Sequence, residues 1–389
     1  MELYVYSPSL ELRGYVQGIS SCQVTLRYAG AGDITLECAS TAENQALLTL
    51  GCYLALRQDR SMQAGQASQA LRRRFDAFRI ESVAWEAEED GALLRIRGAS
   101  LAGLLRLRVV DGVTTVSGNS VAAIHQLVQN NCVQPAAPAR AFPFWRAETG
   151  AGGVSCQKQV AHEPLYETVC ALAAAGGTGF AVDLLPAERT MLFYQYAGVD
   201  RSAGNRFGSF LLLDDRFGNL VSSSYLCDAS ESRTTALVLG EEQNGTRKKV
   251  VVGGEHKGLD RRELVVDAGD LHSSYTENGS QVTLTEAQYQ AQLTTRGEEK
   301  LRDYPVQQRL DGEVPANAGL IFRKDYNLGD LVTVRNRSFG VRSTLRVTAV
   351  QECFDATGSR VVPVLGDETP ALVERMARRM QAQNTRDLR

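Results

Sequence analysis

The sequence lacks the short motifs that mark a reaction centre. It contains no C-x-x-C pair, no H-E-x-x-H and no G-x-S-x-G, which argues against a zinc ribbon, a zinc protease and a nucleophile elbow. The glycine runs at 150–153 and 176–179 are not followed by Lys-Ser/Thr, so neither predicts a phosphate-binding loop. Any role of this protein must therefore come from something other than a local catalytic motif.

Titratable residues show no ligand spacing either. Cys156, His162 and Cys170 are close in sequence, but a loop thiol, a histidine ahead of a helix and a cysteine on a helix face are usually structural. Asp214 and Asp215 precede Arg-Phe-Gly-Asn, where an aspartate commonly caps a turn. The sequence thus predicts no catalytic, cofactor-binding or metal-binding residue. The remaining cysteines are scattered along the chain and are expected to be reduced and mostly buried: Cys22, Cys38, Cys52, Cys132, Cys227 and Cys353. The remaining histidines are His125, His256 and His272.

Strong net charge and long apolar runs are also missing. A net charge of -3 does not indicate a polyanionic partner, and the basic spots Arg72–Arg74 and Lys248–Lys249 are predicted to be solvated loops. No window approaches the ~20 apolar residues of a membrane helix. The N-terminal MELYVYSPSLELRGYV lacks a signal-peptide pattern, so we expect synthesis in the cytoplasm and no stable membrane insertion.

What is present is a globular composition with many short strands. With 43% hydrophobic and 22% charged residues over 389 positions, we expect two or three folded domains. Thr41 is the predicted N-cap of a short helix, and Glu89-Asp90-Gly91 suits a type I′ hairpin. The predicted strands of the first hundred residues are 3–6, 15–19, 21–28, 33–38, 53–56, 77–86 and 92–97.

The middle of the chain alternates helices and strands. Helices are predicted over 120–131 and 164–175, and Gly176-Gly177 should stop the second. Strands should follow over 180–185, 190–196, 210–213 and 221–227, with a loop or boundary over 134–153.

Strands return after residue 235, over 236–240, 247–252 and 263–267. A helix should begin after Thr285 with a capping box, and Tyr289, Leu293 and Leu301 form its apolar stripe ahead of Pro305.

Two distant regions echo each other. LGCYLAL (50–56) matches LGDLVTV (328–334), FRIESVAWE (78–86) matches LRVTAVQEC (345–353), and IRG (96–98) matches VLG (364–366). The first copy is longer by about the segment SMQAGQASQALRRR. Chance alternation of strands is the alternative, but the order of turns and strands favours a duplicated β-barrel.

The stretch KDYNLGDLVTV (324–334) predicts a tight turn that starts a strand. Gly329 should adopt a backbone conformation that side chains tolerate poorly. We expect Gly329→Val to cost about 1–3 kcal/mol of folding stability.

Several of these segments resemble the tail hub proteins of long-tailed bacteriophages and prophages, including the hub module of tail-associated lysins. The resemblance runs from Met1 to about Asp367. It rests on ELYVYSPSLELRGYV, YAGAGDITLECASTAEN with LLTLGCYLAL, FGNLVSSSYLCDASESRTTALVLGE, GLDRRELVVDA, TEAQYQAQLTTRGEEKLRDY and DYNLGDLVTV. Residues 135–153 match poorly, and the C-terminal helix candidate at 369–381 is unmatched.

The resemblance implies a mainly β fold, with two related antiparallel β-barrels around a central α+β domain. The expected domains are a first barrel over 1–115, the α+β domain over 116–234, a second barrel with an inserted helix over 235–368, and a helix or tail over 369–389. The resemblance also implies a structural protein of the virion tail tip and not an enzyme, because the chain ends too soon after its last strands to hold a hydrolase domain. Three copies would form a ring that adapts a sixfold tail tube to a threefold fibre or spike, with a channel for DNA.

The expected partners are further copies of this chain, distal tail or tube proteins, the tape measure protein, and a fibre, spike or receptor-binding protein. Two other readings remain. One is the hub of a contractile injection particle. The other is a β-barrel carbohydrate-binding protein or glycan hydrolase, for which Trp85, Trp145 and Tyr194 would line a cleft with carboxylates.

Overall fold

The computed structural model describes residues 2–57, 75–88, 91–150, 152–205, 210–243, 245–277, 280–315, 318–338, 340–356 and 358–366. The chain divides into two compact units, unit 1 (Met1–Tyr225 with Leu310–Arg389) and unit 2 (Leu226–Arg309). The Arg72–Arg74 spot, the turn residues Glu89-Asp90 and the helix predicted at 369–381 lie outside the described residues. The mainly β class is confirmed, while the four predicted domains stay a prediction.

The N-terminal strands of unit 1 form one antiparallel sheet in the order β2-β1-β5-β6-β7-β4-β3. Strand β4 shows why these residues choose this structure. Its apolar residues Ile34, Leu36 and Cys38 alternate with polar ones, so one face is buried and the other half-exposed. The elements are β1 (Leu3–Tyr6), β2 (Leu12–Tyr15), β3 (Ile19–Arg27), β4 (Asp33–Ala39), α1 (Ala42–Leu47), β5 (Tyr53–Arg57), β6 (Phe75–Glu88) and β7 (Gly91–Ser100).

The strand predicted over 15–19 is wrong in its middle, since β2 ends at Tyr15 and β3 begins at Ile19. Gly18 has a φ of +61°, which breaks an extended strand. The side chain of Asn44 accepts from the Gln17 N–H at 3.3 Å and donates to the Gln17 carbonyl at 2.8 Å. A residue of α1 thus supplies the backbone partners that a sheet would otherwise provide.

A central α+β region follows in unit 1. Strand β11 joins it to the first sheet by pairing with β6, and β12 lies between β11 and the parallel strand β9. The loop predicted over 134–153 contains a strand, β9. The sequence did not predict it because a three-residue strand whose partner is distant in the chain has no local pattern. The elements are η1 (Leu101–Leu107), β8 (Val113–Asn119), α2 (Ser120–Val128), η2 (Gln129–Val133), η3 (Pro138–Arg140), β9 (Trp145–Ala147), β10 (Ser155–Ala161), α3 (Leu165–Gly176), β11 (Gly179–Leu185), η4 (Pro186–Glu188) and β12 (Thr190–Tyr196).

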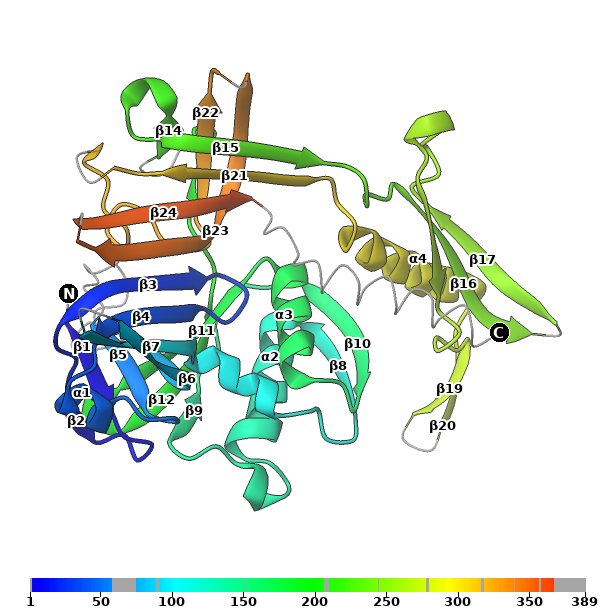
Figure 1. The fold of residues 1–389 in the computed structure, drawn as a ribbon. Helices are drawn as coiled ribbons and strands as arrows, with labels where there is room; N and C mark the ends of the chain where they lie inside the picture. The colour runs from blue at the N-terminus through cyan, green and yellow to red at the C-terminus, as the bar shows by residue number, and fades with distance from the viewer. Residues whose placement is uncertain are drawn as a thin grey trace. The chain divides into compact units, whose positions relative to one another are not determined.

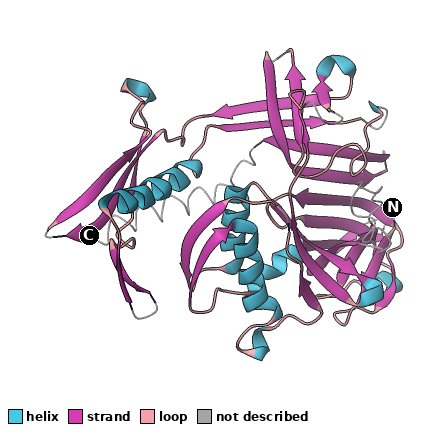
Figure 2. Cartoon of the chain, turned by 180° about the vertical axis from the view of Figure 1, so that it is seen from behind, coloured by secondary structure: helices cyan, strands magenta, loops and turns pink. Residues whose placement is uncertain are grey.

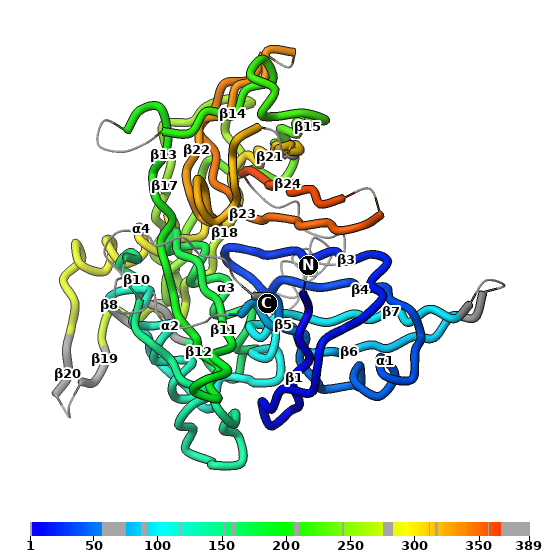
Figure 3. Tube along the Cα trace, turned by 90° about the vertical axis from the view of Figure 1, so that its left-hand side faces the viewer, coloured from blue at the N-terminus to red at the C-terminus, as the bar shows by residue number. Residues whose placement is uncertain are grey.

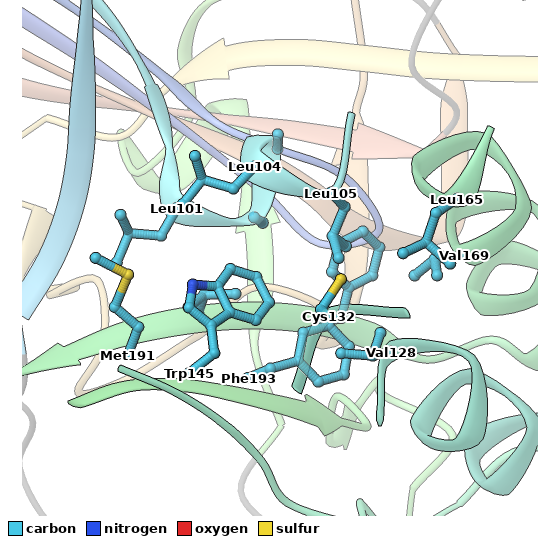
Figure 4. Close-up of a cluster of buried hydrophobic side chains, with 14 of the residues drawn as sticks. Leu101, Leu104, Leu105, Val128, Cys132, Trp145, Leu165, Val169, Met191 and Phe193 are labelled. Atoms are coloured by element: carbon cyan, nitrogen blue, oxygen red, sulfur yellow. The ribbon is translucent and has the colours of Figure 1, made fainter. Parts of the chain in front are cut away.

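The central region is held by a dense apolar cluster. Figure 4 shows Trp145 from β9 beside Met191 and Phe193 from β12, with Val169 of α3 in the same cluster. Helix α3 ends as predicted, because its C-cap Gly177 has the left-handed φ of +63°. Figure 2 shows α2 and α3 side by side, next to the curved strand pair of β8 and β10.

The second sheet of unit 1 is formed by strands from residues 200–228 and 307–366, which are separated along the chain (Figure 1). Strand β23 lies between β22 and β24, β24 also pairs with β21, and β21 pairs with β15. Short parallel strands β13 and β14 pair with the other edge of β22. The elements are β13 (Asp200–Arg201), β14 (Leu212–Asp214), η5 (Asp215–Phe217), β15 (Val221–Asp228), β21 (Gln307–Glu313), β22 (Leu331–Asn336), β23 (Val341–Asp355) and β24 (Gly358–Gly366).

Unit 2 contains a small sheet, in which β16 lies between β17 and β18, and one long helix. Tyr289 and Leu293 of α4 pack with Val238 and Val250 of the sheet. The predicted capping box at Thr285 is confirmed. The Lys248–Lys249 spot is not a loop as predicted, because it lies within β17. The elements are β16 (Thr235–Gln243), β17 (Thr246–Val252), η6 (Gly258–Asp260), β18 (Glu263–Asp267), β19 (Ser274–Glu277), β20 (Ser280–Thr283) and α4 (Glu286–Arg302).

Candidate functional site

The segments that echo each other in the sequence form matching three-stranded arrangements. Strand β6 lies between β5 and β7, as β23 lies between β22 and β24. Tyr53 pairs with Arg79 in the first arrangement, and their counterparts Leu331 and Arg346 pair in the second. The two sheets therefore share their strand order and register in this part.

The turn that starts the matched strands is also the same. Gly51 and Gly329 have φ values of +83° and +86°. The Gly51 N–H donates to the Ile80 carbonyl at 3.0 Å, and the Gly329 N–H donates to the Val347 carbonyl at 2.7 Å. The expected left-handed glycine of KDYNLGDLVTV is present, and its hydrogen bond recurs in the first sheet.

The polar half of this turn is organised by Asp330, which is 1% exposed. Its carboxylate accepts from the Arg201 guanidinium at 2.7 Å, from the Val199 N–H at 2.8 Å and from the Asn327 N–H at 2.9 Å. A buried carboxylate with this many donors is satisfied structurally. The Asp330 carboxylate thus fixes the geometry of the turn and of the strand that follows it.

A bulge completes the match and corrects one detail of the echo. The register shifts after Ile80 in the first sheet and after its counterpart Val347 in the second. Ile80 pairs with Gly98, whereas Val347 pairs with Leu365. The IRG segment is therefore displaced by one residue from the predicted alignment, because Gly98 corresponds to Leu365 and not to Gly366.

One strand pair joins the two sheets. Strand β3 runs antiparallel to the second half of β23, with Arg27 opposite Ala349 and Cys22 opposite Phe354. The two strands lie side by side in Figure 1 and Figure 3. The ladder continues through the Tyr28 N–H, which donates to the Thr348 carbonyl at 2.8 Å.

A buried ion cluster lies close to this strand pair. Arg323 contacts Asp76 of β6 and Glu352 of β23, the latter at 3.4 Å, and the three side chains are 11%, 15% and 14% exposed. Burial raises the pKa of Glu352, the Arg323 guanidinium opposes this shift, and the Asp76 carboxylate adds to it. The cluster thus connects strands of the two sheets through three mostly buried charged side chains.

The predicted candidates for chemistry are structural groups. Asp214 is fully buried, pairs with Arg335 and accepts from the Arg216 N–H at 2.8 Å. Burial acts to raise the pKa of Asp214, but these hydrogen bonds outweigh it and the pKa is lowered. Asp215 accepts from the Arg337 N–H at 3.1 Å. Both aspartates thus hold the turn that begins at η5, as the sequence predicts.

The cysteines and histidines do not assemble either. Within the described residues, no group of three His, Cys, Asp or Glu side chains has the geometry to hold a metal ion. Burial raises the pKa of Cys38 to about 11 and of Cys22 and Cys132 to about 12, so these thiols are unreactive. Cys227 is exposed.

The aromatic residues of the carbohydrate-binding alternative are dispersed. Trp145 is buried in the central cluster, where its ring lies 4.9 Å from that of Phe142. Tyr194 donates to Asp183 at 3.3 Å, and Trp85 is exposed on β6. The described residues contain no helix long and apolar enough to span a membrane.

Comparison with known proteins identifies the family. A family model described as Siphovirus ReqiPepy6 Gp37-like protein matches residues 2–367. The chain belongs to this family. A search of curated protein sequences gave no match. Membership of a siphovirus tail protein family, predicted from the sequence, is confirmed.

Solved structures of three tail proteins share the fold of this chain. The tail protein of Neisseria meningitidis MC58 is 14% identical, with a TM-score of 0.56 over 94% of this chain and 96% of that one. The prophage tail protein gp18 of Listeria monocytogenes EGD-e is 14% identical, with a TM-score of 0.54 over 99% and 100%. The 43 kDa tail protein of prophage MuSo2 from Shewanella oneidensis is 12% identical, with a TM-score of 0.53 over 94% and 98%. At these identities the likeness concerns the fold.

For this Gp37-like protein, sequence reasoning found the repeat but not the strand pair that joins its copies. The apolar residues of β3 are a sequence signal that this strand is paired on both sides. Cys22, Val24 and Leu26 are buried in β3, whereas Val221 of β15 is exposed. A strand paired on both sides needs more apolar residues than an edge strand does.

Proposed function

We propose that this protein is a structural hub of the phage tail tip, in which three copies close into a ring at the end of the tail tube. The observation that carries the proposal is the repeat within one chain, with matching strand order, glycine turn and bulge in both sheets. Each repeat would be a related antiparallel barrel, flanking the central α+β region. Three chains then present six similar surfaces to a sixfold tube.

The threefold side of the ring comes from elements that occur once in each chain. Unit 2 begins within β15 and ends within β21, and the central α+β region lies between β7 and β13. Three copies of these elements suit a threefold fibre or spike. Such a ring would contact the distal tail or tube proteins, the tape measure protein and a fibre, spike or receptor-binding protein.

The absence of assembled chemistry among the described residues supports a structural role. The Asp214 and Asp215 carboxylates are engaged in a turn, and the Asp76 and Glu352 carboxylates are paired with Arg323. We propose that the protein is not an enzyme and that the ring encloses a channel lined by polar side chains, through which DNA passes. The siphovirus family favours a long non-contractile tail over a contractile injection particle.

Counting copies tests this proposal. Quantitative mass spectrometry of purified tails, calibrated against the major tube protein, should give three copies of this chain per tail. The isolated chain can be monomeric, so its mass in light scattering is informative only beside that of intact tails. One copy or six copies per tail would refute the trimeric hub.

A further inference from the structure

The strand pair between the two sheets has a simple construction. Strand β22 covers the first half of one flank of β23, and β3 covers the second half of that flank. Strand β24 pairs with the opposite flank. The two sheets are thus linked where β3, the outer strand of the first sheet, pairs with the part of β23 that β22 leaves uncovered.

Strand β21 is the counterpart of β4. Cys38 of β4 pairs with Leu94 of β7. Val314, just after β21, forms a bridge with Val361 of β24, which is the counterpart of Leu94 in the register established above. Val314 therefore corresponds to Cys38, and Gly312 corresponds to Leu36.

Strand β15 is in turn the counterpart of β3. Leu36 pairs with Cys22 of β3. Strand β15 pairs with β21, as β3 pairs with β4. A Cβ atom on Gly312 would lie 2.4 Å from the Cδ1 of Leu220, just before β15, and 3.3 Å from the Cβ of Ser223 within β15. From this contact we place Ser223 at the position that Cys22 has in the first sheet. Tyr225 then corresponds to Val24, and both side chains pack toward the core of their own sheet.

The flank that β3 covers on β23 is uncovered on β6. Pairing with β5 ends at Arg79, and among the described residues no strand pairs with Ser82–Glu86 on that flank. Ser82 is exposed, whereas its counterpart Ala349 is 2% exposed beneath β3. Trp85, on the same stretch, is 62% exposed.

Strand β15 has few features that would keep another strand away; these are the positive φ of +49° at Ser222, near its start, and the charged Asp228 at its end. Residues 221–227 contain no proline and no charged side chain, the usual means of blunting an exposed edge. Val221 is 36% exposed, and most of the strand is open to solvent. The chain therefore has a donor strand and an acceptor flank of the same kind as the pair that already joins its two sheets.

We infer that β15 of one copy pairs antiparallel with Ser82–Glu86 of β6 in a neighbouring copy. This inference rests on the proposed ring, because a head-to-tail contact between copies forms a closed ring only when its rotation closes. The contact would repeat, between two chains, the strand pair that already exists within one chain. Main-chain hydrogen bonds would supply the affinity, as in other cases of strand addition.

The internal strand pair also fixes the register. Val24 lies opposite Glu352. Their counterparts Tyr225 and Trp85 therefore face each other across the new contact, where an aromatic cross-strand pair is stabilising. The exposure of Trp85 in the single chain follows from this, since its partner belongs to another copy.

Disulfide trapping in assembled tails tests the register. Gln23 lies opposite Cys353, so their counterparts Ser224 and Glu86 should be opposite each other. Ser224→Cys with Glu86→Cys, in a Cys227→Ser background, brings two cysteines within bonding reach. Tails that assemble under reducing conditions and are then oxidised should show most of this chain as a covalent trimer on a non-reducing gel. The control Ser224→Cys with Glu81→Cys, displaced along β6, should stay monomeric.

The outcomes separate the strand contact from the trimer. Covalent oligomers of another size would support the contact and refute the three-copy ring. Three copies per tail without this bond would refute the contact and leave the hub intact, as would equal bonding in the control or a bond within one chain. Co-expressed single variants give a second route, because only a bond between chains can join them.

Discussion

Gly51 and Gly329 occupy the same turn in the two sheets, but their surroundings differ. A Cβ on Gly51 would find only the Arg79 guanidinium, at 3.9 Å, whereas a Cβ on Gly329 would lie 2.2 Å from the ring of Tyr28. The hydroxyl of Tyr28 donates to the Gly177 carbonyl at 2.9 Å, so the ring is held in place from the central region. The second glycine thus has a packing role in addition to its conformational one.

This difference gives a matched pair of substitutions. Gly51→Ala should cost about 1 kcal/mol from its positive φ alone. Gly329→Ala should cost more, about 2–4 kcal/mol, because the ring of Tyr28 must move as well. The contact with Tyr28 therefore raises the cost expected for Gly329→Val above the about 1–3 kcal/mol predicted from the turn alone. Chemical denaturation of the two variants measures the difference. Equal losses of stability would show that Tyr28 yields freely.

Glu352 supplies a pH-dependent contribution at the link between the sheets. Its pKa is raised above 4.5 by burial, so the folded chain binds this proton more tightly than the unfolded chain does. Its contribution therefore favours folding below the unfolded pKa and is lost as the pH rises through the folded pKa. Arg323 keeps Asp76 as a partner when Glu352 is replaced.

Glu352→Gln should remove this dependence. The melting temperature of the variant relative to the parent should rise steadily from pH 4 to pH 7, because the neutral amide mimics the protonated acid. Thermal melts across this range measure the trend. A difference that falls with pH would mean that the ion pair with Arg323 dominates over burial.

At the scale of elements, local sequence patterns predict those strands and helix ends that depend on neighbouring residues. The strands at Leu3–Tyr6, Thr190–Tyr196 and Glu263–Asp267 match their predicted bounds, and the capping box at Thr285 fixes the start of α4. Strand alternation does not say which edge pairs with which, so the link between β3 and β23 was missed. The Arg323 cluster was missed for the same reason, since its members are far apart in the chain.

The edge of β6 yields a prediction about assembly. Trp85→Lys should leave the melting temperature of the isolated chain almost unchanged, because an exposed side chain contributes little to folding. It should nevertheless reduce incorporation into tails at least tenfold, since a charge there would oppose strand pairing. Val113→Lys on β8, at a similarly exposed apolar residue, is the control and should assemble normally. Normal incorporation of the Trp85 variant would argue against an assembly role for this edge.

At the scale of the whole molecule, the chain combines elements present twice with elements present once. The two similar sheets share their glycine turn, bulge and register. In the first sheet the short segment 28–32 connects β3 to β4. In the second sheet the counterparts β15 and β21 are connected through unit 2. A ring of three such chains is sixfold in its sheets and threefold in its insertions. We propose three copies because two similar sheets in each of three chains would match a sixfold tube.

Cryo-electron microscopy of intact tails tests the central claim most directly. The account predicts a tail-tip ring of three chains, in which the sheets of residues 3–100 and 212–366 alternate around the axis in six similar positions against the tube. A ring with one sheet of each chain turned away from the tube, or with one or six copies of the chain, would contradict it.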